Sequence, residues 1–319
     1  MSQKSIWMKS PFMSKLLSYL KGVSKDEEVI FRLKTTLKMT LIPIASGCIM
    51  AGFLYVLLEM NLYFFEANGY QGWQSFKEVY YEFIIGSTLK LVPYIAGFIA
   101  VVAITGIYVS DLLLRPFRII GDYCEKVVNG EDTSYDPDFF TDLKLLTTFS
   151  ELFFLNIHNT RKAKRSLEPM DIPTKYTRIH QPVSETAFFL QYFLYILIVS
   201  ICAYMALYIA TVDMHQGIIN LAGESLKSSK MMTYFFNRQT EVLQDVLQVV
   251  MFGHILMYVA LARHLYYKVC GPAFGIFATM RAFLKGNYSS RVHLIGYYYL
   301  RTHCRKLNRY LDLMQKELT

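Results

Sequence analysis

Few residues of this chain combine a reactive side chain with a position suited to chemistry, and His254 is the main candidate. It lies in an apolar stretch, where an ionisable side chain is a functional hypothesis by default. A proton relay or a cofactor ligand is one interpretation. A neutral imidazole hydrogen-bonded to a neighbouring helix is the favoured one. Glu59, Asp111 and Arg263 lie near the ends of apolar stretches, from which they can reach water.

Catalytic and metal-binding motifs are missing from the sequence. It contains no P-loop, no kinase nucleotide-binding signature and no cyclase or phosphodiesterase signature. The five Cys residues form no CxxC or Cys/His ligand spacing, and none falls in a predicted external loop. We therefore expect no disulfide, no metal, no cofactor and no enzymatic activity.

The composition is that of a membrane protein. The chain has 319 residues, of which 53% are hydrophobic, and its mean hydropathy is +0.26. An ordinary soluble domain is less apolar. Four stretches are long enough to cross a bilayer, which takes about 20 apolar residues: 40–64, 91–114, 187–212 and 246–267. The expected fold class is all-α, a polytopic membrane protein with four transmembrane helices.

The distribution of Lys and Arg predicts the orientation of these helices. Residues 1–38, 115–186 and 263–319 contain 8, 10 and 10 of them, so 28 of the 33 lie on one side. By the positive-inside rule, this side is cytoplasmic. We therefore expect a multi-pass protein of the cytoplasmic (inner) membrane with both termini in the cytoplasm. This orientation also accounts for the net charge of +8 without a nucleic-acid partner.

The segments outside these stretches are expected to be short and non-catalytic. The external loops, 65–90 and 213–245, are too short for a folded ligand-binding domain. The first loop is rich in aromatic residues, which predicts an interfacial belt. Residues 1–37 form a basic amphipathic segment, lying either on membrane lipid or against the protein itself.

An internal repeat organises the rest of the chain. Pro116 and Pro272 each follow an apolar stretch, and Gly130 and Gly286 each lie 14 residues after their Pro. The two copies are therefore offset by 156 residues. A repeat of this kind predicts one supersecondary unit used twice, here a pair of membrane helices followed by a short cytoplasmic helical module.

Each cytoplasmic module carries apolar residues at helical spacing. The last helix has a 4-3-4-3-4 seam typical of a coiled coil. The first copy matches its opening at an offset of 155, which makes the first connector one residue longer, and the seam then lapses at Asn156. The predicted packing positions are Ile120, Cys124, Val127, Leu145, Phe149 and Leu152 in the first copy, and Ile276, Met280, Phe283, Leu300, Cys304, Leu307, Leu311, Met314 and Leu318 in the second.

The spacing of Pro, Gly and apolar seams resembles the HAMP domain of bacterial receptors and sensor kinases. Leu307-Asn308 matches that family's later Asn motif, while Tyr298-Tyr299-Leu300-Arg301 stands where the family has Asp-Glu-x-Gly. The resemblance covers about residues 112–158 and 268–318. It implies that Pro116, Gly130, Pro272, Gly286 and Asn308 are coupling or packing positions of two HAMP-like modules.

The expected organisation follows from the repeat. Its segments are 1–37, a cytoplasmic amphipathic segment; 38–115, transmembrane pair 1; 116–159, module 1; 160–186, a polar linker; 187–270, transmembrane pair 2; and 271–319, module 2. The basic run 161–165 can touch anionic lipid, although a solvated linker is favoured.

Two functions are compatible with this organisation. The first is a non-catalytic relay that transmits conformational change through HAMP-like bundles to a separate cytoplasmic or membrane partner. The alternative is a structural or accessory subunit of a larger membrane complex. Because a HAMP-type module is a parallel bundle of four helices, we hypothesise that the two copies pair within one chain as a pseudo-dimer. A homo-oligomer in which each module pairs with its own copy is the rival arrangement.

Overall fold

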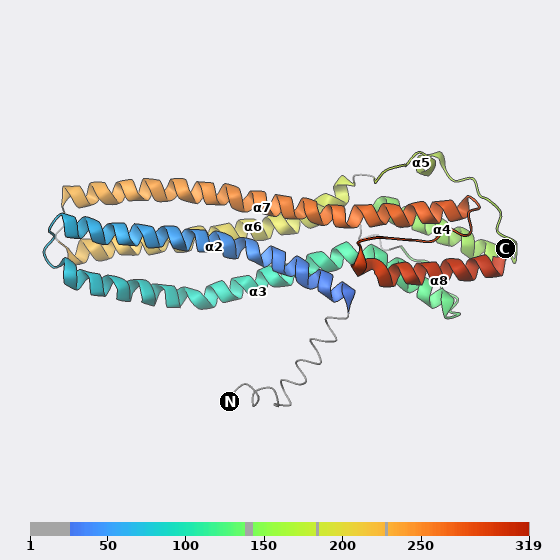
Figure 1. The fold of residues 1–319 in the computed structure, drawn as a ribbon, viewed down its shortest axis with the longest axis horizontal. Coiled ribbons are helices and arrows are strands. Elements are labelled where there is room, and N and C mark those ends of the chain that lie inside the picture. The colour runs from blue at the N-terminus through green and yellow to red at the C-terminus, as the bar shows by residue number, and fades with distance from the viewer. Residues whose placement is uncertain (1–25, 138–142, 183–184, 227–228, 319) are drawn as a thin grey trace, which may run out of the picture. The chain divides into compact units, whose positions relative to one another are not determined.

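The computed structural model describes residues 26–137, 143–182, 185–226 and 229–318, and every regular element in this part of the chain is a helix (Figure 1). The all-α prediction is thereby confirmed. Most of the predicted amphipathic segment 1–37 lies outside the described residues. The helices are α2 (Glu27–Ala67), α3 (Trp73–Val128), α4 (Lys144–Lys162), α5 (Thr174–Thr177), α6 (Thr186–Ser225), α7 (Lys230–Leu284), the 3₁₀ helix η3 (Tyr298–Leu300) and α8 (Arg301–Leu318).

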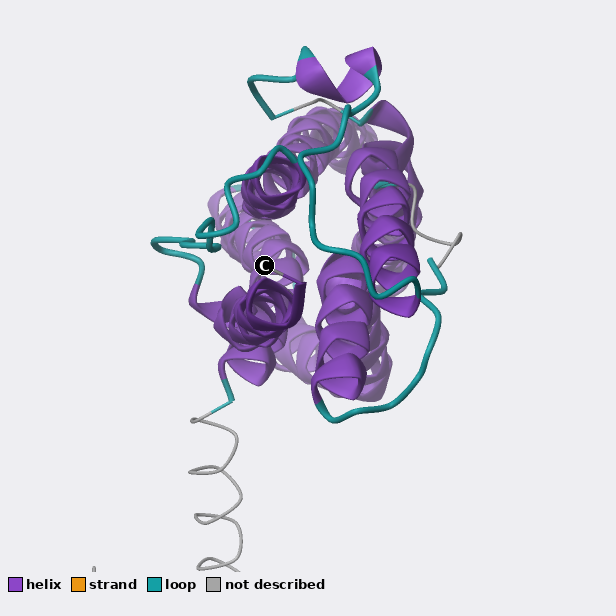
Figure 2. Cartoon of the chain, turned by 90° about the vertical axis from the view of Figure 1, so that its right-hand side faces the viewer, coloured by secondary structure: helices purple, strands orange, loops and turns teal. Residues whose placement is uncertain are grey.

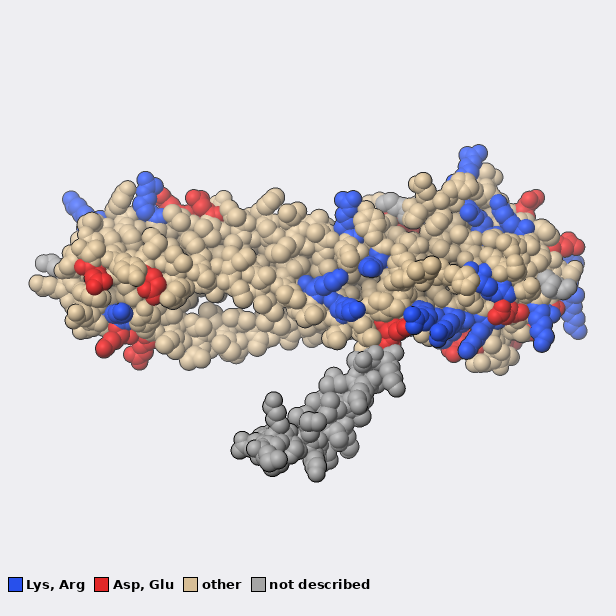
Figure 3. All heavy atoms as spheres, viewed as in Figure 1, with Lys and Arg blue, Asp and Glu red and all other residues tan. Residues whose placement is uncertain are grey.

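Four of these helices, α2, α3, α6 and α7, are long and apolar enough to cross a membrane, which confirms the predicted number. Each contains a stretch without Asp, Glu, Lys or Arg, and Figure 3 shows the broad uncharged surface that results. Large apolar side chains lie exposed on this surface, with exposed fractions of 76% for Tyr94, 73% for Val249 and 70% for Phe252. Such exposure suits contact with lipid tails rather than water.

The predicted lengths of the two external loops are wrong. Residues 65–90 and 213–245 are almost entirely helical, and only 68–72 and 226–229 connect α2 to α3 and α6 to α7. The aromatic residues placed there in an interfacial belt instead form a core cluster, in which Phe65, Phe76 and Tyr80 are buried with Phe236 of α7. These segments are too polar to be predicted as membrane-spanning. Mutual burial of the aromatic rings nevertheless stabilises them as continuations of the long helices.

The chain divides into two compact units. Of the described residues, those within 26–35, 107–192 and 263–318 form the first, called the bundle unit here, and those within 36–106 and 193–262 form the second, the membrane-helix unit. The four long helices contribute residues to both. Helices α3 and α7 continue without a break through Pro116 and Pro272, so the predicted domain boundaries at 115/116 and 270/271 are not helix ends. Each predicted module begins as the last part of a longer helix.

Within the bundle unit, α4 packs beside the last part of α7. The rings of Phe149 and Phe277 have centroids 4.7 Å apart, and those of Phe153 and Phe283 lie 6.1 Å apart. Residue numbers rise together in these pairs, so the two helices are parallel. This contact joins the first copy of the repeat to the second within one chain.

Helix α8 is likewise parallel to the last part of α3. A Cβ added at Gly121 would lie 3.3 Å from the Cβ of His303, and Lys306 makes ion pairs of 2.9 and 2.7 Å with Asp122 and Glu125. Figure 2 looks along this unit with the C-terminus toward the viewer, and the loops that leave the helices lie over their ends. The bundle therefore consists of α4, α8 and the last parts of α3 and α7.

Both copies of the repeat end their first helix in the same way. Gly130 has a φ of +86° and Gly286 a φ of +96°, a backbone conformation that only Gly adopts readily. After α3, the N–H groups of Gly130 and Glu131 donate to the carbonyls of Val127 and Lys126. The equivalent bonds follow α7. This is the Schellman motif, and it explains the repeated Gly.

Replacing Gly286 with Ala is expected to destabilise the protein, because a Cβ at this φ is strained and would approach Cγ of Pro169 to 3.1 Å. The left-handed conformation alone costs about 1–2 kcal/mol in a residue with a Cβ. The measurement is the thermal unfolding midpoint in detergent. Gly223→Ala is the matched control, because an added Cβ there meets no atom within 4 Å and φ is not positive. An equal loss in both variants would contradict the prediction.

Candidate functional site

The core of the four-helix bundle is the first candidate site, because it contains most of the predicted packing positions. In the last parts of α3 and α7, all six predicted apolar positions are buried: Ile120, Cys124, Val127, Ile276, Met280 and Phe283. In η3 and α8 the whole predicted seam is buried as well: Leu300, Cys304, Leu307, Leu311, Met314 and Leu318. Burial raises the pKa of the Cys304 thiol to about 12, so this cysteine is a packing residue rather than a nucleophile.

The seam of α4 differs from the prediction. Leu145 and Leu152 are only half-buried, whereas Phe149 is buried together with Leu146 and Phe153. The apolar face also continues through Ile157, so the seam does not lapse at Asn156. Apolar residues are adjacent in α4, at 145–146 and 152–155, so periodicity alone did not select a face. Stacking of the large Phe rings against α7 and α8 selects it.

The connector lengths are also reversed relative to the prediction. Helix α4 begins at Lys144 and α8 at Arg301, an offset of 157 rather than 155. Because α3 and α7 end at an offset of 156, the second connector is the longer one, by one residue. In this register Leu143 and Leu300 are equivalent, and both are buried.

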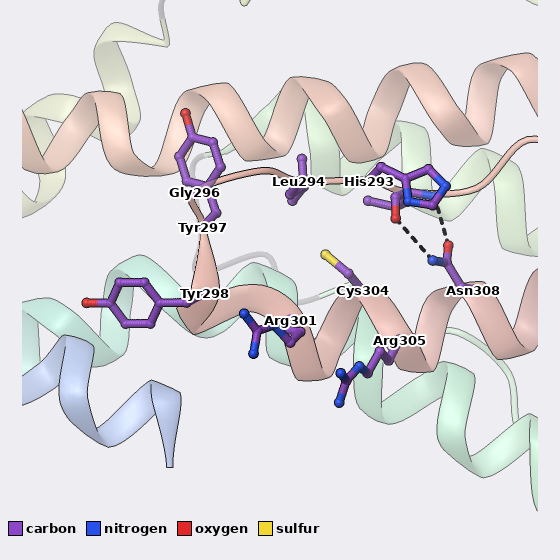
Figure 4. A pocket seen from close by; sticks show the side chains of 10 residues that line it. His293, Leu294, Gly296, Tyr297, Tyr298, Arg301, Cys304, Arg305 and Asn308 are labelled. Atoms are coloured by element: carbon purple, nitrogen blue, oxygen red, sulfur yellow. Dashed lines mark hydrogen bonds between the residues drawn. The ribbon is translucent and has the colours of Figure 1, made fainter. Parts of the chain in front are cut away.

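Asn308 binds the second connector, which comprises residues 285–300 between α7 and α8, to α8. Its side-chain oxygen accepts a hydrogen bond from the N–H of Val292 at 2.8 Å, and its amide nitrogen donates to the carbonyl of Val292 at 3.1 Å (Figure 4). Leu294 packs on α7, where its Cδ2 would lie 2.8 Å from a Cβ added at Gly275. The connector is therefore held between two helices of the same copy.

The polar linker packs against the bundle, contrary to the favoured solvated interpretation. The N–H of Leu167 donates to the carbonyl of Leu318 at 2.8 Å, and that of Met170 donates to the carbonyl of Leu284 at 2.9 Å. These carbonyls end α8 and α7 and would otherwise lack an intrahelical partner. Arg281 then donates to two carbonyls of the linker, those of Tyr176 at 2.8 Å and Ile179 at 2.6 Å. We call residues 163–182 the strap.

A cluster of charged side chains joins α2, α3 and α8 in the bundle unit. Arg118 pairs with Glu28 at 3.0 Å and with Asp111 at 2.8 Å, and Arg32 pairs with Asp111 at 3.0 Å and with Glu28 at 3.4 Å. His303 of α8 has its Nε2 3.9 Å from the Glu28 carboxylate. Two carboxylates and two guanidinium groups thus neutralise one another beside a buried imidazole.

The cluster lowers the pKa of Glu28, which lies in the first turn of α2, well before the apolar stretch that begins near residue 40. The His303 imidazole and the Arg118 guanidinium lower this pKa to about 2, against the opposing effect of burial. Glu28 is therefore ionised throughout the physiological range. It provides a fixed negative charge that holds α8 and α3 against the start of α2.

His254 makes a hydrogen bond to a neighbouring helix, as in the favoured interpretation of its sequence. The imidazole is buried, its Nδ1 lies 2.8 Å from the hydroxyl oxygen of Ser46, and its ring packs edge-on to Tyr258. No group of three or more His, Cys, Asp or Glu side chains that could hold a metal occurs among the described residues. Glu59 accepts a hydrogen bond from the Tyr81 hydroxyl at 3.1 Å, and Arg263 contacts Tyr267.

Sequence reasoning missed the charged cluster and the strap. Asp111 and Arg118 are seven residues apart on one helix, so their common face was a usable signal. Glu28 and His303 are separated by nearly the whole chain, and no sequence pattern indicates that they pair.

Among comparisons with known proteins, no family model, no curated protein and no solved structure matches this chain.

Replacing Glu28 with Gln is expected to lower the unfolding midpoint at pH 7 and to have little effect near pH 2. A group whose pKa is lowered on folding contributes stability above its unfolded pKa, about 4.5, and loses it as the pH falls toward about 2. The measurement is the midpoint of both proteins across this range in detergent.

Glu131→Gln is the control for this prediction, because Glu131 is exposed on the first connector and its side chain has no ion pair with the described residues. Its midpoint should follow that of the unmodified protein at every pH. A Glu28→Gln effect of the same size at pH 7 and pH 2.5 would rule out the proposed electrostatic role.

Proposed function

We propose that this chain is a non-catalytic signal-relay protein of the cytoplasmic membrane. In this proposal, conformational change in the membrane helices passes through two HAMP-like modules to a separate partner protein. The observation that carries the proposal is the continuity of α3 and α7, which have 56 and 55 residues. Each runs without a break from a membrane-crossing stretch into the four-helix bundle. A helix transmits rotation, tilt or axial shift along its length because its backbone hydrogen bonds are all internal.

The parallel bundle supports the resemblance to HAMP domains. Both copies have a long first helix closed by a Gly of positive φ, an extended connector and a second parallel helix. Each second helix packs against the first helix of the other copy. We therefore propose the intrachain pseudo-dimer, with both termini in the cytoplasm. A homo-oligomer of such chains remains compatible with this arrangement.

A disulfide between Cys residues at positions 121 and 303 tests the intrachain pairing. The Cβ of His303 lies 3.3 Å from a Cβ added at Gly121, close to the separation of about 3.5–4.5 Å in disulfides. In a background with the five native cysteines changed to alanine, Gly121→Cys with His303→Cys should oxidise to a faster-migrating monomer on a non-reducing gel. Each single variant should stay a monomer. Covalent dimers from either single variant would favour the homo-oligomer.

The strap favours the alternative function, a structural subunit of a larger complex. Its Tyr176 packs on Phe149 of α4 and accepts a hydrogen bond from Arg281 of α7, which restrains movement between the two copies. A relay requires that the bundle respond to the membrane helices, whereas a scaffold requires only that it persist. The two functions therefore differ in one measurable property, the coupling between the connecting turn of α2 and α3 and the bundle.

Restraining the external turns is expected to change the bundle if the chain is a relay. Tyr70 and Ser229 lie on the two turns, and their hydroxyl groups are 2.6 Å apart. Cys residues placed at these positions can be joined by a short, membrane-impermeant bismaleimide, after Ser replaces the exposed Cys48 and Cys202. Hydrogen exchange of α4 and α8 is then compared with and without the linker. We expect a change of several-fold in their exchange rates.

Two controls separate the possible results of this experiment. A Gly-Gly insertion after Tyr108 should weaken the effect by breaking the rigidity of α3, because only α7 then stays continuous. Unchanged exchange in the uninterrupted protein would exclude the relay and support the scaffold. Reaction with the reagent only from the cytoplasmic side of sealed vesicles would show that the proposed orientation is wrong.

A further inference from the structure

A cavity of about 300 Å³ lies in the bundle unit between the second connector and the first half of α8 (Figure 4). It is separate from the charged cluster but borders the core seam at Cys304, and the proposed relay assigns it no role. The polar and aromatic side chains that line it and matter here are His293, Tyr297, Tyr298, Arg301, Arg305 and Asn308.

The cavity carries an excess of positive charge. Arg301 and Arg305 are one helical turn apart, and Figure 4 shows them projecting from the same side of α8. Arg301 shares its charge with Glu27, whereas Arg305 is exposed and has no ion pair or hydrogen bond with the described residues. Lys34 adds a further charge beside the Tyr298 hydroxyl, 3.2 Å away. Glu27 pairs with only one of the two arginines that line the cavity, and an anionic ligand would balance the other.

The cavity lies beside the point where α7 leaves its apolar stretch. The Tyr299 hydroxyl donates to the carbonyl of Lys268 at 2.7 Å, and Lys268 directly follows residues 246–267. One turn further along α7, the Tyr297 hydroxyl lies 2.9 Å from a Cβ added at Gly271. Tyrosines with one apolar and one polar end are typical of the membrane–water interface. The cavity thus lies at the end of this apolar stretch, where the proposed membrane arrangement places the lipid headgroups.

The tip of the same connector is apolar. Ile295 lies two residues before Tyr297, and its side chain is 94% exposed, the largest exposed fraction of any large apolar residue described. Gly296 follows it with a φ of +86°, which turns the chain back toward α8. An isoleucine at such a tip is unfavourable in water and suits the boundary between headgroups and acyl chains.

We propose that this cavity binds the phosphate-bearing headgroup of an anionic phospholipid from the adjacent leaflet. Arg301 and Arg305 contact the phosphate oxygens, to which a guanidinium group can donate two parallel hydrogen bonds. Ile295 enters the acyl boundary beside the headgroup. The apolar tip and the adjacent apolar stretch of α7 select a lipid over a free phosphate, which has no apolar part.

The test uses the full chain in detergent with dioctanoyl phosphatidylglycerol as the anionic probe and dioctanoyl phosphatidylcholine as the neutral probe. The midpoint of thermal unfolding is measured against lipid concentration. The protein should be stabilised by the anionic lipid at concentrations where the neutral lipid has no effect. Arg305→Gln should shift the required concentration upward by about tenfold, as expected for loss of a charge-assisted contact.

Arg309→Gln is the matched control, because Arg309 is exposed one turn further along α8, has no partner among the described residues and does not line the cavity. It should leave the lipid dependence unchanged, whereas Ile295→Ser should weaken it. An equal loss for Arg305→Gln and Arg309→Gln would reduce the effect to general charge attraction and overturn the site.

Two further results would also overturn the lipid assignment. The first is equal stabilisation by inorganic phosphate, which would make a free phosphate the ligand. The second is displacement of the lipid effect by a short polyglutamate that itself stabilises the protein, which would indicate an acidic polypeptide. Midpoints of all variants without lipid establish that each one folds.

Discussion

The structure depends on the burial of apolar seams that neither copy of the repeat can cover alone. Each copy contributes two parallel helices to the bundle unit, and two helices with one apolar stripe apiece leave half of that stripe in water. Phe149 and Phe153 of the first copy find their partners in Phe277 and Phe283 of the second. Covalent linkage raises the effective concentration of the second copy, so pairing within the chain costs less entropy than association of two chains.

Helix ends impose the second constraint. Parallel helices gather their unpaired carbonyl groups at the same end of the bundle, where each needs a donor. Gly130 and Gly286 turn the chain back to supply some of these donors. The strap supplies others through the N–H groups of Leu167 and Met170. A segment that looks like a linker in the sequence is thus part of the bundle, and it also limits how far the two copies can move apart.

The opposite end of the bundle unit is held by charge as well as by apolar burial, which includes the stacking of Phe31 on Tyr299. Glu28, Arg32, Asp111 and Arg118 form a nearly neutral cluster close to the start of the membrane-crossing stretches, where a single unpaired charge would be costly. His303 extends this cluster to α8. Any movement of α2 or α3 along its axis must rearrange these pairs, which gives the proposed relay a definite place to act.

The sequence by itself determined the all-α class, the four helices long and apolar enough to cross a membrane, and the 14-residue spacing from Pro to Gly, because these depend on composition and on backbone properties local to each residue. It did not determine which face of α4 is buried, since Leu145, Leu146, Leu152 and Phe153 are all apolar and only packing against α7 and α8 distinguishes them. The tertiary structure also decided the pairing of Glu28 with Arg118 and the position of the strap. These contacts join groups distant in sequence, and their free energy depends on geometry that no local pattern records.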